Sequence, residues 1–461
     1  MRPYAALILA AGKGTRMKSK VCKVLHTIAG RPMISYVIDA VRLLGFERIV
    51  LVVGHQADEV QKSISPDGLE FVLQEPQLGT GHAVAASAGR LRDFDGNALI
   101  LCGDIPLIRS ETLQDFRSYH ERQESRVTVM TASVDDPKGY GRIIRNRNGT
   151  IDRIVEEADA NSEEKGAKEI NTGIYLVDAH LLYSLVDRIQ PENAQGEYYL
   201  TDIVAEAAKE RIPAHACLLQ NPVEATGINT RSELAYASQI IWNRKRQDMM
   251  AACVTMQDPA SVYVDDLAQV GRDTVIHPCV NIMGATEIGE ECIIESGVYI
   301  MNSKIGNRVQ ILQGSRLNKA SVLDETSVGP MAHLRPEAMI GKNCRVGNFV
   351  EVKKTSMGEG SKASHLTYLG DSEIGRNVNI GCGTITCNYD GKKKHRTIIG
   401  DRCFVGSDVQ FVAPVEIGKE SLIGAGSTIT KDVPPRNLAV SRSKQRSYPL
   451  REGQGPGKEE E

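Results

Sequence analysis

The chain has 461 residues, of which 41% are hydrophobic and 25% are charged, and its formal net charge at pH 7 is -3. This length is too great for one ordinary hydrophobic core and predicts two domains, each large enough to hold an active site. Because the chain has no long basic block, it lacks the electrostatic footprint of a nucleic-acid-binding protein, and we expect its substrates to be small molecules.

No segment of the sequence resembles a membrane span, because the longest apolar runs have only the length of a strand. The N-terminus also lacks the charged, apolar and small-residue order of a secretory signal. The ten cysteines form no Cys-x-x-Cys pair, and Cys382 and Cys387 have no His or Cys neighbours that would complete a zinc site. We therefore expect a cytoplasmic enzyme with reduced thiols and no membrane partner.

The first part of the chain alternates between short apolar strands and segments of helical periodicity. Strands are predicted at 4–11, 48–54, 69–74 and 98–102. The spacing of Met33, Val37 and Val41 indicates a helix between the first two strands. This alternation predicts a Rossmann-like α/β domain with a mostly parallel sheet, whose ligands bind at the carboxyl ends of the strands.

A glycine-rich segment, Gly12-Lys-Gly-Thr-Arg16, follows the first predicted strand. Glycine has no Cβ, so the backbone amides here are able to approach an anion closely. The segment is neither a Walker loop nor a dinucleotide fingerprint, so an ordinary turn is the alternative interpretation. Arg16 and Lys23 suit the charge that develops on a pyrophosphate leaving group. Asp104, just after the strand that ends at Cys102, is either a ligand of a hard divalent cation or a helix cap.

The pattern changes after Asn229. Thr230 and Glu233 have the spacing of a capping box, and apolar positions continue in helical order to about Cys253. We interpret residues 230–253 as a linker helix, which leaves residues 1–229 as the first domain.

From Ile288 an aliphatic residue recurs at every sixth position. The clearest tracks are Val328, Leu334, Ile340, Val346 and Val352, and Ile399, Val405, Phe411, Ile417, Ile423 and Ile429. A period of six fits three short strands per coil of a left-handed parallel β-helix, with ~18 residues per coil and ~4.8 Å between coils. We expect this domain at 254–448, with loops where the period breaks at 361–369 and 388–397. The tail at 449–461 is expected to be disordered.

His365 lies in the first of these breaks. A base with a pKa near 6.5 is suited to remove a proton from an amine that attacks a thioester, so His365 is a candidate general base. A solvated loop histidine is the alternative. The lysine cluster 392–394 is either a solvated face or a binding site for phosphorylated substrates.

Several motifs together resemble those of the sugar-nucleotide pyrophosphorylases. They are Leu9–Met17 with Lys23–His26, Gln77–His82, Gly103-Asp104, Gly139–Arg142, Ile170–Gly173 and Gln195–Tyr199. With the hexapeptide repeats and His365-Leu-Thr-Tyr-Leu-Gly370, the resemblance narrows to bifunctional uridyltransferase/acetyltransferases. It implies that the second domain acetylates glucosamine-1-phosphate from acetyl-CoA. The first domain, a nucleotidyltransferase, would then join the product to UTP, giving UDP-N-acetylglucosamine for peptidoglycan and pyrophosphate.

The resemblance also implies site residues. Catalytic roles fall to His365, Lys23 and Arg16. The uridine nucleotide and its sugar would be bound by Leu9, Gly12, Lys23, Gln74, Gly79, Thr80, Asp104, Gly141, Glu156, Asn171, Thr172 and Asn229. Asp104 and Asn229 would hold Mg²⁺. Glucosamine-1-phosphate would be bound by Arg335, Lys353, Tyr368, Asn379 and Lys394, with Glu351 orienting nearby groups. Acetyl-CoA would be bound by Cys382, Asn388, Tyr389, Ser407, Ala425 and Arg442, with Asn388 and Tyr389 also completing the acceptor pocket. A homotrimer formed through the β-helix is implied as well.

Three cysteines depart from the family pattern: Cys22 stands where proline is usual, Cys102 replaces an aromatic residue and Cys382 replaces alanine. Two other functions stay open. One is a single-activity pyrophosphorylase with an inert or regulatory β-helix, against which the intact His365, Arg335 and Lys353 argue. The other is a non-catalytic scaffold, against which Arg16 and Lys23 argue.

Overall fold

The computed structural model describes residues 2–450 of the chain. The chain divides into two compact units, Met1–Trp242 and Asn243–Glu461. The division falls inside helix α8 (Arg231–Ala251), which corresponds to the predicted linker helix. The predicted tail lies outside the described residues from residue 451 on.

The first unit is built on a nine-stranded sheet in the order β5-β4-β1-β6-β10-β7-β11-β9-β8. Its strands are β1 (Tyr4–Ala10), β4 (Arg48–Val53), β5 (Glu70–Leu73), β6 (Asn97–Cys102), β7 (Val127–Ser133), β8 (Arg142–Arg145), β9 (Ile151–Val155), β10 (Glu169–Asp178) and β11 (Ala214–Leu218). A separate hairpin pairs β2 (Thr27–Ile28) with β3 (Arg31–Pro32). Besides α8, the α-helices of the first unit are α1 (Met33–Arg42), α2 (Ala57–Ser63), α3 (Thr80–Ala86), α4 (Ala88–Leu91), α5 (Ser110–Arg122), α6 (Ala179–Val186) and α7 (Asp202–Lys209).

All four predicted strands occur, and β5, β4, β1 and β6 pair in parallel. The rest of the sheet is mixed, because β10 enters it antiparallel to both β6 and β7. The expectation of a mostly parallel sheet is therefore correct only for this first group of strands. Since the carboxyl ends of β1, β4 and β6 meet at one edge, the segments that follow them come together there.

Apolar layers cover both faces of this sheet. Alternate residues of β1 point to opposite sides, so that Ala6 and Ile8 belong to one buried cluster and Ala5 and Leu7 to the other. Helix α1 packs into the first cluster through the predicted positions, including the fully buried Met33. None of the helices within residues 2–450 combines the length and the apolarity needed to cross a membrane.

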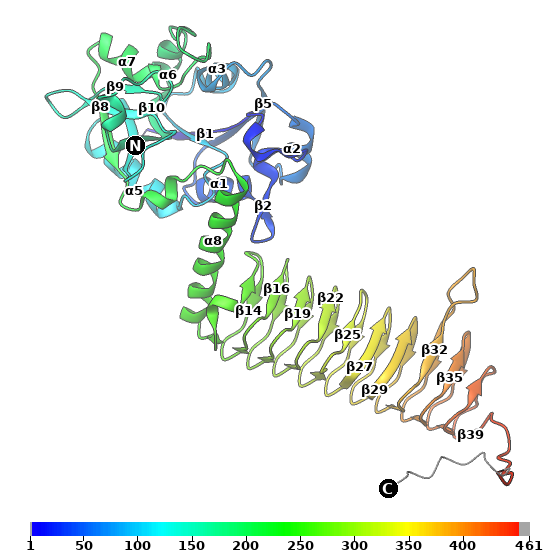
Figure 1. Ribbon diagram of the computed structural model, residues 1–461. Coiled ribbons are helices and arrows are strands. Elements are labelled where there is room, and N and C mark those ends of the chain that lie inside the picture. The colour runs from blue at the N-terminus through cyan, green and yellow to red at the C-terminus, as the bar shows by residue number, and fades with distance from the viewer. Residues whose placement is uncertain (1, 451–461) are drawn as a thin grey trace. The chain divides into compact units, whose positions relative to one another are not determined.

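The second unit is a stack of coils made of short parallel strands, which run from β12 (Thr255–Met256) to β39 (Leu438–Ala439) (Figure 1). One face of the stack is a nine-stranded sheet, and the other two faces join into one sheet of 19 strands. They join because β27 (Arg345–Lys353) continues round a corner, pairing with β24 (Ser327–Val328) at one end and β25 (His333–Leu334) at the other.

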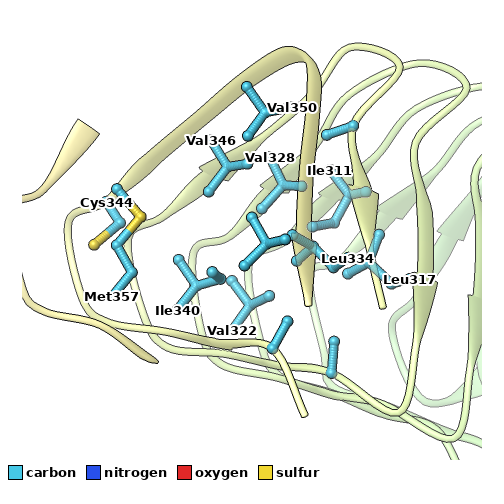
Figure 2. Packing of buried hydrophobic residues seen from close by; sticks show 14 of the residues in the cluster. Ile311, Leu317, Val322, Val328, Leu334, Ile340, Cys344, Val346, Val350 and Met357 are labelled. Atoms are coloured by element: carbon cyan, nitrogen blue, oxygen red, sulfur yellow. The ribbon is translucent and has the colours of Figure 1, made fainter. Parts of the chain in front are cut away.

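The hexapeptide positions point into the stack. Val328, Leu334 and Ile340 are at most 1% exposed and point inward from the three faces of the stack. On each face the side chain lies next to its counterpart on a neighbouring coil, Val328 beside Val346, Leu334 beside Leu317 and Ile340 beside Val322 (Figure 2). The second predicted track, from Ile399 to Ile429, belongs to the same buried cluster. The core is therefore a column of aliphatic side chains that each coil shares with the next.

The structure corrects one predicted loop and agrees with the other. Residues 361–369 were expected to leave the coil, but Lys362–Gly370 form strand β29, which pairs with β27 in a register of 17 residues. The period merely shortens here, because Met357 and Ala363 fill the next inward positions. Residues 388–397 do form an insertion, since Met357 pairs with Ile374 17 residues later, whereas Ile374 pairs with Ile399 25 residues later.

Candidate active sites

In the first unit, the glycine-rich segment borders a cavity of about 460 Å³ at the carboxyl edge of the sheet. The predicted residues that line it are Leu9, Gly12, Lys23, Gln74, Gly79, Thr80 and Asp104. A Cβ at Gly12 would meet no atom within 4 Å, so the missing side chain leaves the backbone open to a ligand. Gly14 adopts a positive φ of 60°, and a Cβ there would lie 2.5 Å from the Cβ of Lys23. This close approach requires glycine.

The segment after β5 forms the opposite wall of the cavity. Gln74 is buried, and its amide donates to the carbonyl of Gly79 at 3.0 Å. Gly79 has a φ of 111°, and its Cβ would lie 2.6 Å from the carbonyl oxygen of Tyr198. The hydroxyl of Thr80 accepts from the amide of Leu200 at 3.0 Å. These contacts hold the residues of the wall together.

Two cationic side chains converge on Asn229. Its Oδ1 accepts from Arg16 at 2.8 Å and from the Nζ of Lys23 at 2.7 Å. The same Nζ donates to the carboxylate of Asp104. The backbone brings the two segments together, because the amide of Ile228 donates to the carbonyl of Asp104 at 2.9 Å. Residues that are far apart in the sequence thus share one charged centre beside the glycine-rich segment.

This centre has the donor chemistry of a magnesium site. Asp104 and Asn229 both present a side-chain oxygen to the same ammonium group, so a cation already lies between two hard ligands. Mg²⁺ prefers one or two such protein oxygens and completes its shell with water and substrate phosphates. The described residues hold no group of three or more His, Cys, Asp and Glu side chains that would bind a metal alone. The residues present fit Mg²⁺ bound jointly with a nucleotide.

The predicted sugar-binding residues form a second group. Asn171 lies at a bulge in β10, where its backbone amide donates to the carbonyl of Gly141 at 2.9 Å. A Cβ at Gly141 would lie 3.4 Å from a carboxylate oxygen of Glu156, whose pKa is raised chiefly by burial. Cys102 joins this group to the cavity, since its Sγ lies 3.6 Å from the Cβ position of Gly173. The hydroxyl of Thr172 donates to the carbonyl of Met130 at 2.6 Å.

Two of the cysteines that differ from the family pattern, Cys102 and Cys22, occupy different environments in the first unit. Cys102 lines the cavity, and burial raises the pKa of its thiol to about 12. Cys22 is buried beside the backbone carbonyl of His55, away from the cavity lining. Burial also raises its pKa. Both thiols are therefore neutral packing groups near neutral pH.

In the second unit, His365 lies on β29 opposite Asn348 on β27. Its Nδ1 donates to the Oδ1 of Asn348 at 2.8 Å, which leaves Nε2 as the basic nitrogen of the neutral ring. His365 is exposed. Asn348 is not indicated by the sequence alone, because its place opposite His365 depends on the pairing register of β27 and β29.

Three cations gather at the end of β27, the strand that also carries Asn348. Lys353 has its pKa lowered chiefly by its hydrogen-bonding contact with Lys394, and Arg335 contributes through its charge. Arg335 also donates to Glu351 at 2.7 Å, and Glu351 pairs in register with Tyr368. This cationic group, Arg335, Lys353 and Lys394, suits a phosphate dianion.

The insertion at 388–397 supplies Lys394 and is organised by Asp390. That carboxylate accepts from the amides of Lys392 and Lys393, both at 2.7 Å, and from His395 at 2.7 Å. Asn388 donates to the carboxylate of Asp371. Its Nδ2 and the hydroxyl of Tyr368 both lie next to Gly370, so Asn388 is close to a residue predicted to bind glucosamine-1-phosphate. Tyr389 is 61% exposed.

Four residues predicted to bind acetyl-CoA form a column along the stack. The carbonyl of Cys382 accepts from Asp408 at 2.6 Å, that of Ser407 accepts from Gly426 at 2.9 Å, and that of Ala425 accepts from the side chain of Arg442 at 2.7 Å. His365 heads this column, because the amide of Gly383 donates to the carbonyl of Leu366 at 3.0 Å. Asn379 lies apart from the cationic group, opposite Lys362.

The cavity of the first unit has further walls. Gln77 and Glu197 also line it, although neither was among the predicted site residues. The amide of Gln77 donates to the carbonyl of Gln74 at 3.1 Å. The sequence does point to both residues, since Gln77 lies in the motif Gln77–His82 and Glu197 in the motif Gln195–Tyr199.

The folds and these sites define a nucleotidyltransferase domain joined to a hexapeptide-repeat transferase domain. A model of the MobA-like NTP transferase domain matches residues 6–172. Models of the bacterial transferase hexapeptide and of the hexapeptide repeat of succinyl-transferase match 396–431 and 279–302. These repeats confirm the expected left-handed parallel β-helix.

Relatives match over nearly the full chain. The bifunctional protein GlmU of Pelobacter propionicus is 52% identical, over 96% of this chain and 97% of that protein. GlmU of Geobacter metallireducens is 51% identical, over 96% of this chain and 97% of that protein. GlmU of Shouchella clausii is 46% identical, over 95% of this chain and 96% of that protein. The chain therefore belongs to the GlmU family of bifunctional enzymes.

Proposed function

We propose that the two units catalyse successive steps in the synthesis of UDP-N-acetylglucosamine. The second unit acetylates the amine of glucosamine-1-phosphate with acetyl-CoA. The first unit then transfers the uridylyl group of UTP to N-acetylglucosamine-1-phosphate and releases pyrophosphate. The observation that carries the proposal is the occurrence of a base, a cationic group and a column of residues on successive coils in the second unit, together with a separate charged centre in the first.

In the first unit, Gln74 and Gly79 would bind the uracil and Gly12 the phosphates. The sugar phosphate oxygen would attack the α-phosphorus in line, while Arg16 and Lys23 offset the charge that builds on the departing pyrophosphate. Support comes from the position of both cations beside Asn229 and the glycine-rich segment.

Asp104 and Asn229 would hold Mg²⁺ together with phosphate oxygens. When bound, Mg²⁺ neutralises phosphate charge and orients the triphosphate. Because Lys23 contacts both proposed ligands, its ammonium has to share or vacate this position when the metal complex binds. Gly141, Glu156 and Asn171 would contact the N-acetylglucosamine.

In the second unit, the Nε2 of His365 would remove a proton from the amine as its nitrogen attacks the thioester carbon of acetyl-CoA. The carbon–sulfur bond breaks, coenzyme A leaves as a thiol after protonation, and the acetamide forms. The hydrogen bond from Nδ1 to Asn348 supports this role, because it holds the ring in the tautomer that is basic at Nε2.

The substrates of this step would lie on either side of His365. The cationic group and Tyr368 would bind the sugar phosphate, with the loop residues Asn388 and Tyr389 at its border. Asn379, which pairs with Lys362, lies apart from this group. The column of Cys382, Ser407, Ala425 and Arg442 would bind acetyl-CoA, and Asn388 and Tyr389 would reach it as well. Cys382, which stands where the family usually has alanine, would be tolerated if acetyl-CoA contacts its backbone.

We also propose that the enzyme is a cytoplasmic homotrimer. Met331, Phe349 and Leu366 occupy successive coils with exposed fractions of 49%, 59% and 59%. All three have positive φ angles, which bulky residues rarely adopt, so the corner displays apolar side chains at a conformational cost. Phe349 and Leu366 directly follow Asn348 and His365, which favours an acetylation site next to a neighbouring subunit.

The deciding experiment measures thiol release from acetyl-CoA with glucosamine-1-phosphate and purified protein, without UTP. Release that depends on the sugar phosphate would support two activities. Its absence, with uridylyl transfer intact, would favour a pyrophosphorylase with an inert β-helix. Loss of both reactions would favour the scaffold.

A further inference from the structure

The start of helix α8 lies directly against the charged centre of the first unit. Thr230 and Glu233 form the predicted capping box: the amide of Glu233 donates to the hydroxyl of Thr230 at 3.2 Å, and the amide of Thr230 donates to the carboxylate of Glu233 at 2.8 Å. An ordinary capping box is complete with these two bonds.

Glu233 makes one bond more than the box requires. The same carboxylate oxygen accepts from the amide of Asn229 at 2.6 Å, shorter than its bond to Thr230. Asn229 precedes the cap and is not part of the helix. The carboxylate of Glu233 therefore binds the backbone of Asn229, the residue whose side-chain oxygen accepts from Lys23 and Arg16.

Two further contacts hold Asn229 and the residue before it. The amide of Ile228 is held by the carbonyl of Asp104 at 2.9 Å, and the Nδ2 of Asn229 donates to the carbonyl of Gly227 at 3.3 Å. With its backbone amide held by Glu233 and its Nδ2 by Gly227, Asn229 turns Oδ1 to the cations of the charged centre.

We propose that Glu233 is a positioning residue for the metal site, because it holds the backbone of Asn229 so that Oδ1 faces the cation position beside Asp104. The inference rests on the proposed function, in which Asn229 is a metal ligand. Groups that orient metal ligands without touching the metal commonly change metal affinity by about 10–100-fold when they are removed.

The test measures binding of Mn²⁺ as a probe, from the electron paramagnetic resonance signal of the free ion, to the full chain saturated with UDP-N-acetylglucosamine. Glu233→Ala should weaken binding by about tenfold or more. Glu233→Gln keeps an acceptor oxygen at the same reach and should restore most of the affinity. Glu233→Asp keeps the charge but falls short of the amides, and it should bind as weakly as the alanine variant.

Thr230→Ala is the matched control, because it removes the other half of the capping box and leaves the bond between Glu233 and Asn229 in place. It should lower the unfolding temperature of the first unit and keep wild-type Mn²⁺ affinity. Equal weakening in Thr230→Ala would overturn the inference, since loosening of the helix end would then be sufficient.

Asn229→Ala separates this inference from the function on which it rests. Weak Mn²⁺ binding by Asn229→Ala together with wild-type binding by Glu233→Ala and Glu233→Asp would overturn the positioning role alone. Wild-type binding by Asn229→Ala would overturn the metal assignment itself. If Glu233→Ala does not fold, the comparison of Glu233→Asp with Glu233→Gln decides the same question.

Discussion

His365 and Asn348 face each other on neighbouring coils, and the 2.8 Å hydrogen bond between Nδ1 and Oδ1 sets the protonation pattern of the imidazole. An amide oxygen only accepts, so Nδ1 carries the proton and Nε2 is the free base. A histidine that was only a solvated surface residue would need no partner on the next coil. The pair therefore favours acid–base chemistry at this point of the β-helix.

His365→Ala should lower the rate of acetyl transfer by about 10²–10⁴, the usual contribution of a general base. Uridylyl transfer from UTP to supplied N-acetylglucosamine-1-phosphate should stay at the wild-type rate, because the reaction belongs to the other unit. Both rates are measured on the same preparation. Normal acetylation by this variant would remove His365 as the base.

Asn348→Ala should lower kcat for acetyl transfer more than it raises KM for either substrate, because it frees the ring to rotate and change tautomer. The effect should be smaller than that of His365→Ala, since the base itself remains. Steady-state kinetics with each substrate varied in turn give the two constants. A change confined to KM would mean that Asn348 binds substrate and does not orient the ring.

Lys23→Ala should lower uridylyl transfer by about 10²–10³, as for the loss of one group that stabilises charge in the transition state. Acetyl transfer should be unchanged. Lys62, on α2 and outside the cavity lining, offers a matched control in the same unit. If Lys23→Ala abolished both reactions, the two sites would not be independent.

Excess EDTA should abolish uridylyl transfer and leave acetyl transfer intact, because the proposed Mg²⁺ ligands Asp104 and Asn229 belong to the first unit and the proposed acetylation chemistry uses His365 as its base. Added Mg²⁺ should restore the lost reaction. Uridylyl transfer that continues at full rate in EDTA would contradict the assignment of Asp104 and Asn229.

The hexapeptide period predicts the buried column well, because every sixth side chain must face the same shared core. It fails at 361–369 for a physical reason: the coil shortens by one residue and places Met357 and Ala363 inward, which looks like a break when only large aliphatic residues are counted. The true insertion at 388–397 was predicted correctly, since no shift of one residue restores its period.

Local patterns also predict parts of the sites but not the contacts between them. The spacing of Thr230 and Glu233 indicates a helix cap, but it does not reveal that Glu233 also holds Asn229. That contact depends on the path of the chain just before the helix, where the amide of Ile228 meets Asp104. Pairings of this kind need the register and the turn geometry, which no single segment contains.

Lys394→Ala tests the cationic group and should separate stability from function. In the folded protein, the contact with Lys394 lowers the pKa of Lys353 below its ordinary value of 10.5, and burial and Arg335 lower it further. In the unfolded chain these groups are apart. Between the lowered pKa and 10.5, the unfolded chain binds more protons, so stability should rise with pH through this window. Below the window, the unfavourable pairing of charges is present in full.

The variant should therefore unfold at a higher temperature than the wild type near pH 8, with a flatter pH dependence up to pH 10, and should show a raised KM for glucosamine-1-phosphate. Thermal unfolding of the full chain followed by circular dichroism, with Lys392→Ala as the control from the same loop, measures the first effect. Inorganic phosphate should stabilise the wild type more than Lys394→Ala, because the anion relieves the repulsion between Lys353 and Lys394. An unchanged KM together with equal stabilisation by phosphate would show that the lysines are only a solvated face.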